Sequence, residues 1–478
     1  MTRAVVVGAG PNGLAAAIHL ARNGIDVQVL EASETIGGGS RSGELTVPGV
    51  IHDYCSAAHP LGVGSPFWKE IDLGRYGLTW KWPEVDCAHP LDDGSAGVLY
   101  QSVDQTAAGM GSDGRRWRLA LGDLAKGFDD LGQDLMRPVL HVPRHLIRLV
   151  ALGPRGVLPA TVVARWFRTE QARALYGGAA AHSFTRLDRP PTGGIGLIFL
   201  AGGHRYGWAV AQGGSGSIIA ALAAALRAHG GAIATGITVT SRADIPDADI
   251  VMLDLNPAGA VQIYGDEMPG RIKRSYRRYR QGPSAFKVDF AIEGAIPWFN
   301  PDCRRAGTVH LGGTFAETAY TERQRAAGQM AQRPFTLVGQ QYLADPSRSA
   351  GNINPIWSYA HVPFGYTGDA TAAVVDQIER FAPGFRDRVI ATVSKSTAEL
   401  QAYNRNYVGG DIIGGANDRL QVLFRPRVAV DPYFTGVPGV YLCSQSTPPG
   451  AGIHGLCGYH AAESALRRLR RPTGSPSA

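Results

Sequence analysis

Five residues near the N-terminus form a motif of the G-x-G-x-x-G type: Gly8, Gly10, Pro11, Asn12 and Gly13. The apolar run 4–7 before the motif predicts a buried strand, and the run 14–23 after it predicts a helix. In that setting the first glycine permits a tight turn, the second lets a pyrophosphate approach the backbone, and the third allows close helix–strand packing. The helix N-terminus then favours the phosphate charge. The pattern predicts a dinucleotide site, against the alternative of a strand–turn–helix with chance glycines.

A carboxylate follows the next predicted strand. Residues 25–30 (IDVQVL) form this strand, and Glu31 ends it. The Glu31 carboxylate can accept hydrogen bonds from both ribose hydroxyls of a dinucleotide, and it repels a 2′-phosphate. The first 31 residues therefore predict a βαβ unit that binds a dinucleotide other than NADP.

A second glycine cluster favours FAD over NAD as the predicted cofactor. The stretch 37–42 reads GGGSRS, directly after the acidic residue, which is typical of the extended FAD signature. Gly37 and Gly38 let backbone amides reach the pyrophosphate and the flavin side, and Arg41 can hydrogen-bond to phosphate or flavin-edge oxygens. The alternative is a flexible loop.

The composition is that of a folded globular protein. The chain has 478 residues, 44% hydrophobic and 18% charged, with a net charge of +7. Its five cysteines are widely spaced without a CxxC pair, which predicts a reducing compartment and no metal site. No signal-peptide pattern and no membrane span are expected. We therefore expect a cytoplasmic protein, with peripheral contact at the inner membrane face as an open alternative.

Several blocks of sequence, spread over nearly the whole chain, carry a family resemblance; three of them are VVVGAGPNGLAAAIHLARNGIDVQVLEASETIGGGSRSGEL, QGGSGSIIAALAAALRAHGGAI and GVYLCSQSTPPGAGIHGLCGYHAAESAL. They resemble the phytoene-desaturase-like branch of the superfamily of FAD-dependent amine oxidases and carotenoid oxidoreductases. Within it they most resemble the subgroup called pyridine nucleotide-disulfide oxidoreductase domain-containing protein 2.

The resemblance implies an α/β fold with non-covalent FAD: a Rossmann-type FAD-binding domain that is discontinuous in sequence, an inserted antiparallel-sheet substrate domain and a helical cap. We expect the FAD-binding domain to consist of three parts, at 1–59, 205–284 and 425–471. A mostly helical cap is expected at 60–204 and the substrate domain at 285–424. The tail 472–478 is expected to be disordered.

The resemblance also assigns roles near the C-terminus. The Pro/Gly turn that leads into the last predicted helix is implied to pass the pyrimidine end of the flavin, so Gly450, Gly452 and Ile453 join the predicted cofactor site. Val239 is a further predicted cofactor residue. The motif 213–217 (GGSGS) is implied to complete the FAD site rather than to form a second nucleotide fold, and the cysteines are too far apart in sequence for a flavin-linked dithiol.

Three residues are candidates for catalysis: His454, Tyr407 and His204. His454 lies in the C-terminal turn, where an imidazole can act as an acid or base or simply position the backbone. Tyr407 lies in a Gly-rich loop that should line the cavity. All three can equally be structural.

The leading hypothesis is an FAD-dependent oxidoreductase that transfers hydride at flavin N5. It would dehydrogenate, reduce or isomerise a hydrophobic substrate such as an isoprenoid or lipid. One alternative is an amine oxidase, for which Trp357 and Tyr359 can supply an aromatic pair. The other is a non-catalytic FAD-loaded scaffold that binds a protein partner.

Two segments are strongly basic. Residues 136–173 hold seven arginines and one glutamate among apolar residues, which indicates either a patch that contacts anionic lipid or a solvated arginine face. Residues 270–280 carry six cations in eleven positions, but no nucleic-acid motif accompanies them. We expect 270–280 to be a basic surface helix and expect no nucleic-acid partner.

Overall fold

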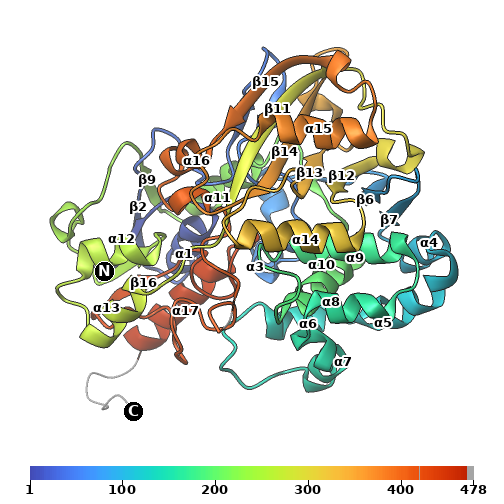
Figure 1. Cartoon of the computed structure of the whole chain (residues 1–478). Helices are drawn as coiled ribbons and strands as arrows, with labels where there is room; N and C mark the ends of the chain where they lie inside the picture. Colours follow the sequence, from blue (N-terminus) through green and yellow to red (C-terminus); the bar gives the residue numbers. More distant parts are fainter. Residues whose placement is uncertain (419, 471–478) are drawn as a thin grey trace.

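The computed structural model describes residues 1–418 and 420–470; the expected tail 472–478 lies outside them. A five-stranded, fully parallel sheet forms one half of the molecule (Figure 1). Its strand order is β16 (Val440–Leu442), β10 (Ile250–Leu253), β1 (Arg3–Val7), β2 (Asp26–Leu30) and β9 (Ala232–Ala234). The predicted N-terminal βαβ unit is confirmed, because β1 and β2 are neighbours joined through a helix.

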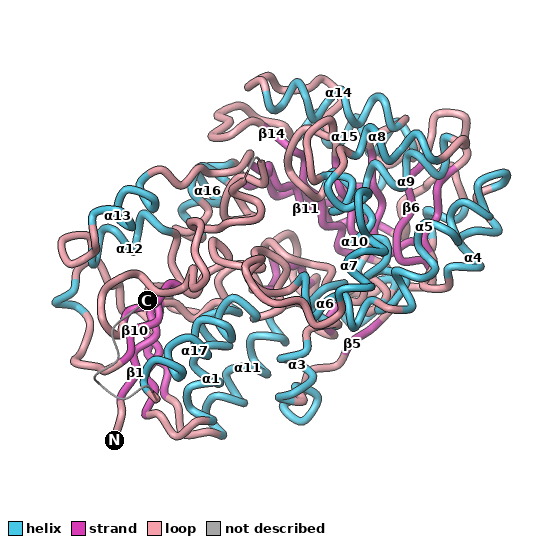
Figure 2. Tube along the Cα trace, turned by 90° about the horizontal axis from the view of Figure 1, so that it is seen from below, coloured by secondary structure: helices cyan, strands magenta, loops and turns pink. Residues whose placement is uncertain are grey.

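Helices cover both faces of this sheet. On one face lie α1 (Pro11–Arg22), α11 (Gly216–Ala228) and α17 (Leu456–Leu469), which Figure 2 shows side by side. The other face packs on α12 (Pro257–Tyr264) and α13 (Gly270–Arg277). At the crossing of α1 and α17 the backbones are so close that a Cβ on Gly458 would collide with the carbonyl oxygen of Asn12.

A second, seven-stranded sheet forms the other half. Its order is β15 (Val389–Lys395), β11 (Ser284–Glu293), β14 (Ile353–Val362), β13 (Thr336–Gly339), β12 (Ala306–Leu311), β6 (Val85–Pro90) and β7 (Ala96–Leu99). All neighbours are antiparallel except β12 and β6. The predicted antiparallel sheet of the substrate domain is confirmed. Its outer face packs against α15 (Thr371–Phe381).

The strands β6 and β7 lie within residues 60–204, a segment that was predicted to be mostly helical and that is helical over most of its remaining length. The pair forms a hairpin around Asp93 and Gly94, where Gly94 has φ +83° and Asp93 accepts a hydrogen bond from the backbone N–H of Ser95 at 2.9 Å. An Asp-Gly pair is a strong hairpin signal. Smaller two-stranded pairs join β5 (Trp80–Lys81) to β8 (Val210–Ala211) and β3 (Ser42–Glu44) to β4 (Ile51–Asp53).

The rest of 60–206 forms a helical layer with its own core. It contains α2 (Pro60–Val63), α3 (Pro66–Ile71), α4 (Val103–Ala108), α5 (Gly114–Lys126), α6 (Phe128–Leu135), α7 (Leu146–Val157), α8 (Ala160–Val163), α9 (Glu170–Ala181) and α10 (Thr192–Tyr206). Helix α9 packs on the inner face of the second sheet beside β6, β7 and β12. This layer is the predicted helical cap.

Two further local structures are set by single residues. Helix α14 spans Phe315–Ala326, and the Thr314 hydroxyl caps its start by accepting from the Glu317 N–H at 3.1 Å. Strand β9 ends shortly before Gly236, which turns the chain with φ +70°. The last helix before the C-terminal core, α16, spans Thr397–Tyr403.

Candidate cofactor and active site

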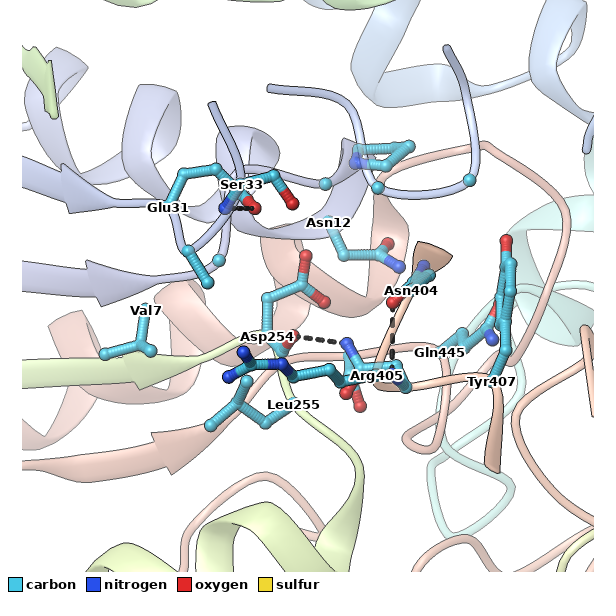
Figure 3. Close-up of a pocket in the computed structure, with 18 of the residues that line it drawn as sticks. Val7, Asn12, Glu31, Ser33, Asp254, Leu255, Asn404, Arg405, Tyr407 and Gln445 are labelled. Carbon is cyan, nitrogen blue, oxygen red and sulfur yellow. Dashed lines mark hydrogen bonds between the residues drawn. The ribbon is translucent and has the colours of Figure 1, made fainter. Parts of the chain in front are cut away.

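The carboxyl ends of β1, β2 and β10 open into one cavity. Six stretches that are far apart in sequence contribute to its wall, at 7–12, 30–41, 237–239, 254–255, 402–407 and 444–453. Figure 3 shows Glu31 at one end, Tyr407 and Gln445 at the other, and Asn12 with Asp254 between them. Ligands of parallel sheets bind at this edge, outside the carboxyl ends of the strands.

The glycine motif forms the middle of the cavity. Gly8 has φ +104°, which favours glycine, and its N–H donates to the Leu30 carbonyl at 2.8 Å. A Cβ on Gly13 would collide with the Gly8 carbonyl, so the third glycine permits close helix–strand packing as predicted. The Gly10 position opens into the cavity together with Pro11 and Asn12. The buried Asn12 Oδ1 has no hydrogen-bond partner among the described residues, which leaves an acceptor for a ligand.

Glu31 lies at the end of the cavity that the ribose requires. Its Oε2 accepts from the Ala9 N–H at 2.8 Å and its Oε1 from the Ser33 N–H at 2.9 Å, so both oxygens are fixed at the cavity wall. Val239 lines the same end beside Ile237 and Thr238. The structure thus brings these two predicted residues together.

The second glycine cluster faces the first across a narrow gap. Gly37 has φ +128° and donates to the Ala9 carbonyl at 2.9 Å, which ties the two loops together. A Cβ on Gly38 would lie 3.2 Å from the Gly10 Cα. Glycine backbone therefore flanks the gap from both loops, as expected where a pyrophosphate has to pass.

Arg41 is held by its own loop. Its guanidinium donates to the Thr35 carbonyl at 2.6 Å and the Ile36 carbonyl at 3.2 Å, and lies 5.2 Å from the Tyr403 ring. The side chain is mostly buried and lines the cavity, so it is a fixed cation near the expected pyrophosphate.

The motif 213–217 does not line the cavity, contrary to what the resemblance implies. Ser215 N–H donates to Asp53 at 2.7 Å, its hydroxyl contacts His59 Nε2 at 2.9 Å, and Gly216 N–H donates to the Ser42 hydroxyl at 3.0 Å. The motif therefore supports from behind the strand β3, which follows Arg41.

Asp254 is a cavity residue that sequence reasoning missed. It follows β10, and its Oδ2 accepts from the Gly13 N–H at 3.0 Å. Burial and, to a lesser extent, the nearby Glu31 charge raise its pKa to about 7. The signal was present, because a carboxylate directly after a buried parallel strand belongs to the ligand edge of the sheet.

The C-terminal turn closes the flavin end of the cavity. Gly452 and Ile453 line it, whereas Gly450 lies behind them and accepts a contact from the Cys457 thiol at 3.3 Å. Ile453 has φ +53°, and its carbonyl accepts from the Trp68 indole N–H at 3.0 Å. The predicted turn is therefore locked from outside by the helical layer.

His454 is buried behind Gly452 rather than in the cavity wall. Its Nδ1 accepts from the Leu456 N–H at 3.1 Å. Burial, and to a lesser extent His460, lower its pKa to about 3. The imidazole is therefore neutral at physiological pH, and its position fits the alternative of a histidine that positions the turn.

Tyr407 lines the cavity, as its Gly-rich loop predicted. Its hydroxyl lies so close to Gly39 that a Cβ there would collide with it. Burial raises its pKa well above the usual range, as does the neighbouring Cys55 thiol. Tyr407 is thus a neutral phenol at the flavin end, beside Gln445.

His204 does not reach the cavity, so we remove it from the catalytic candidates. It lies in α10 within the core of the helical layer, where Nε2 accepts from the Trp117 indole N–H at 3.0 Å and Nδ1 donates to the Tyr100 carbonyl at 2.9 Å. Both ring nitrogens are occupied. From sequence alone, a histidine in a helix next to a glycine pair gave no sign of this packing.

Behind Tyr407 the second sheet presents an aromatic face. The Trp357 indole N–H donates to the Cys55 carbonyl at 2.8 Å, and the rings of Trp357 and Tyr359 meet edge to face at 5.0 Å. Lys287 on the same face is ion-paired with Asp289.

A second cation lies beside this pair. Lys395 Nζ lies 4.5 Å from the Tyr54 ring and 5.0 Å from the Tyr403 ring. Two lysines against one aspartate leave this region of the face without an excess of negative charge.

The residues of the cavity fit FAD. Along the cavity lie, in turn, a carboxylate for the ribose, paired glycine loops, a fixed arginine and the unpartnered acceptor of Asn12. Tyr407 lies at the far end. Bound there, the pyrophosphate would be held by the 8–13 loop and by Arg41, and the flavin by the 444–453 segment.

The chain is similar to known proteins in sequence and in fold. A family model described as an NAD(P)-binding Rossmann-like domain matches residues 6–71. Pyridine nucleotide-disulfide oxidoreductase domain-containing protein 2 of Rattus norvegicus is 24% identical, covering 98% of this chain and 94% of its own. Hydroxyneurosporene desaturase of Cereibacter sphaeroides is 27% identical over 98% of each chain.

A solved structure of putrescine oxidase bound to putrescine shares the fold, with a TM-score of 0.61, 16% identity, and coverage of 98% of this chain and 99% of that one. The sequence relatives, the shared fold and the geometry of the cavity all indicate the same kind of flavoprotein. The chain is an FAD-dependent oxidoreductase that is similar in sequence to hydroxyneurosporene desaturase and in fold to putrescine oxidase.

Proposed function

We propose that this oxidoreductase acts on CH–CH bonds of an uncharged, hydrophobic substrate such as an isoprenoid or lipid. The observation that carries the proposal is the aromatic face behind Tyr407. Its one aspartate, Asp289, is already paired with Lys287, and Lys395 adds a further positive charge. An ammonium group brought there would meet cations, whereas a neutral hydrocarbon would meet the Trp357 and Tyr359 rings.

The chemistry fits this kind of substrate. Bound FAD supplies hydride transfer at N5. In the oxidative direction the substrate loses a hydride from one carbon and a proton from its neighbour, a C=C bond forms, and the electrons pass on to an acceptor such as oxygen or a quinone. The neutral Tyr407 hydroxyl is the polar group of this chain best placed to orient the substrate.

A named relative supports the substrate class. Hydroxyneurosporene desaturase, by its name, desaturates hydroxyneurosporene, and its similarity extends over nearly the whole of both chains. We further place the protein in the cytoplasm, because its five cysteines are all free and buried, as in a reducing compartment.

One anaerobic experiment tests the function. The purified holoprotein is mixed with isoprenoid and acyl-lipid extracts, with primary amines and with NAD(P)H, while the flavin absorbance is followed. We expect bleaching by a lipid fraction and none by amines. Bleaching by amines alone would make the protein an amine oxidase. If every class fails although dithionite reduces the flavin, the scaffold hypothesis holds instead.

A variant pair isolates the role of Tyr407. Tyr407→Phe removes only the hydroxyl, and Tyr407→Leu also removes the ring. If the hydroxyl orients the substrate, both variants slow reduction by substrate but leave reduction by dithionite unchanged. Equal rates for wild type and Tyr407→Phe would show that only the ring matters.

A further inference from the structure

The outer edge of the helical layer exposes a cluster of large apolar side chains. Nine of the 22 exposed large hydrophobic residues in the described chain fall within 28 positions: Val139, Leu140, Val142, Leu146, Ile147, Val150, Val157, Val162 and Trp166. We call them the α7 surface, since α7 forms its centre. Figure 1 shows α7 at the margin of the molecule, away from both sheets. Scattered exposed apolar residues are ordinary, but a concentration of this kind marks an interaction site.

Helix α7 is apolar on two sides. Its inner side places Leu149 and Leu152 against the core of the helical layer. On the opposite side Leu146, Ile147 and Val150 are exposed to 62%, 84% and 66%. A helix that only had to cover its own layer would carry polar residues on that side.

The loop before α7 is held firmly although its apolar side chains face outward. The buried Asp134 carboxylate accepts from the backbone N–H groups of Arg144 at 2.9 Å and His145 at 2.8 Å, and contacts His141 Nε2 at 3.0 Å. Val142, between these anchors, is 87% exposed. The exposure of Val142 is therefore a feature of a fixed loop and does not arise from a frayed one.

Unpaired cations surround the apolar residues. Arg144, Arg155, Arg165 and Arg168 form no ion pair with any described residue, whereas Arg148 lies 3.7 Å from Asp130. Apolar side chains with a half-exposed tryptophan, rimmed by arginines, match the boundary between headgroups and acyl chains of an anionic membrane.

We propose that the α7 surface docks the holoenzyme onto an anionic lipid surface, with α7 lying in the plane of the interface. No single described helix is long and apolar enough to cross a membrane; α7 and the segment Ala160–Trp166 meet those criteria only as a pair bent by 98°. The chain directly before this surface touches the cofactor half, because His460 Nε2 of α17 contacts the Met136 carbonyl at 2.9 Å.

Charge argues against a second copy of this chain as the occupant. A two-fold dimer through the same surface would bring the arginines of one copy against those of the other. An anionic bilayer instead offers negative headgroups to the arginines and an apolar interior to the exposed apolar side chains.

The test is co-sedimentation of the holoprotein with vesicles. Phosphatidylcholine vesicles are compared with vesicles that also contain phosphatidylglycerol, at low and at high salt. We expect binding to the anionic vesicles only, reversed by high salt as screening increases. The triple variant Arg144→Glu, Arg155→Glu and Arg165→Glu should lose about 100-fold in partition, at about tenfold or less for each arginine. Ile147→Glu with Val150→Glu should lose at least about tenfold.

Helix α13 supplies a matched control. Its Arg271, Arg274 and Arg277 are exposed, but its apolar Ile272 and Tyr276 are buried. Reversing these three charges changes the net charge of the protein by the same amount as the α7 triple variant, without touching an exposed apolar face. We expect this control variant to keep most of its vesicle binding.

The outcomes separate the alternatives. Absence of binding to anionic vesicles at low salt would overturn the proposal, as would an equal loss in the α13 control. A concentration-dependent dimer that Ile147→Glu abolishes, without vesicle binding, would assign the surface to a second copy. Retained flavin absorbance shows that each variant is folded. The readout is binding and not turnover, so its failure leaves the proposed reaction untouched.

Discussion

The Asp254 carboxylate accepts a hydrogen bond from the Gly13 N–H at 3.0 Å, at the helix N-terminus where the cofactor phosphates are expected. A Cβ on Gly10 would lie 2.7 Å from the same carboxylate oxygen. Two kinds of negative charge, the carboxylate and the pyrophosphate, therefore share one small region. This relationship makes the affinity for FAD depend on the protonation of Asp254.

We expect FAD to bind more tightly at pH 6 than at pH 8. Burial, and secondarily Glu31, raise the pKa of Asp254 to about 7, so the carboxyl is neutral below that pH and charged above it. Above pH 7 the affinity should fall by up to about tenfold per pH unit in wild type. Asp254→Asn should bind FAD with little pH dependence. Dissociation constants from flavin fluorescence test this, and an unchanged slope in the variant would contradict it.

The same proton affects the apoprotein. Because the folded pKa of Asp254 lies above its ordinary value of 3.8, the folded state holds a proton that the unfolded state has released. The contribution of this group to the free energy of unfolding is therefore largest below about pH 4 and is lost as the pH rises to about 7.

Gly10→Val should weaken FAD binding. Its side chain would press on Asp254 and fill the gap that Gly10 shares with Gly38. Overpacking of this kind costs about 1–3 kcal/mol, or about 5- to 150-fold in the dissociation constant. The control is Gly122→Ala in α5, where a Cβ meets open space. This variant should keep its full flavin content. A folded Gly10→Val protein with full flavin content would refute the site.

His454 should contribute no titration to activity near neutral pH. Its pKa is lowered to about 3 by burial and by His460, so the ring stays neutral from pH 5 to 8. His454→Gln should therefore leave the shape of the pH–rate profile unchanged, although the rate itself falls if the turn moves. Loss of one limb of the profile in the variant would restore His454 as an acid or base.

Thiol reagents should not inhibit the enzyme. Burial raises the pKa of the Cys55 and Cys443 thiols and that of Cys457 to about 12, so the reactive thiolate is scarce. We expect the native holoprotein to react with less than one equivalent of a disulfide reagent while the unfolded chain reacts at all five cysteines. Rapid inactivation by alkylation would instead reveal a dithiol step.

NADPH should reduce the flavin poorly. The described residues contain one parallel sheet with a dinucleotide loop, and the second glycine-rich motif follows the two-residue strand β8 of an antiparallel pair. Stopped-flow mixing with micromolar NADPH should show slow reduction that does not saturate. Fast, saturable bleaching would indicate a nucleotide site elsewhere.

Residues within local motifs could be predicted from the sequence, whereas residues whose role depends on tertiary packing could not. The glycine loops, Glu31, Arg41 and Tyr407 were accessible because each lies within a short motif next to a predicted strand or turn. Asp254 carried a local signal, as a carboxylate directly after a buried strand, but its place beside the glycine motif depends on the arrangement of the strands, since β10 and β1 are neighbours only in the folded sheet. For His204 and His454 the sequence left a catalytic and a structural role open for a related reason. Whether an imidazole is satisfied by Trp117 or by the Leu456 N–H depends on contacts that no local pattern encodes.

The crossing of α1 with α17 determines when, during synthesis of the chain, the FAD cavity becomes complete. Gly458 of α17 packs directly against the backbone of Asn12 in α1. The cavity is lined by Gly8 near the N-terminus of the chain and by Ile453 near its C-terminus. Until the last helix has been made, α1 lacks the cover of α17 and the cavity lacks the wall formed by Gly452 and Ile453. Tight flavin binding therefore requires the chain to be complete through α17.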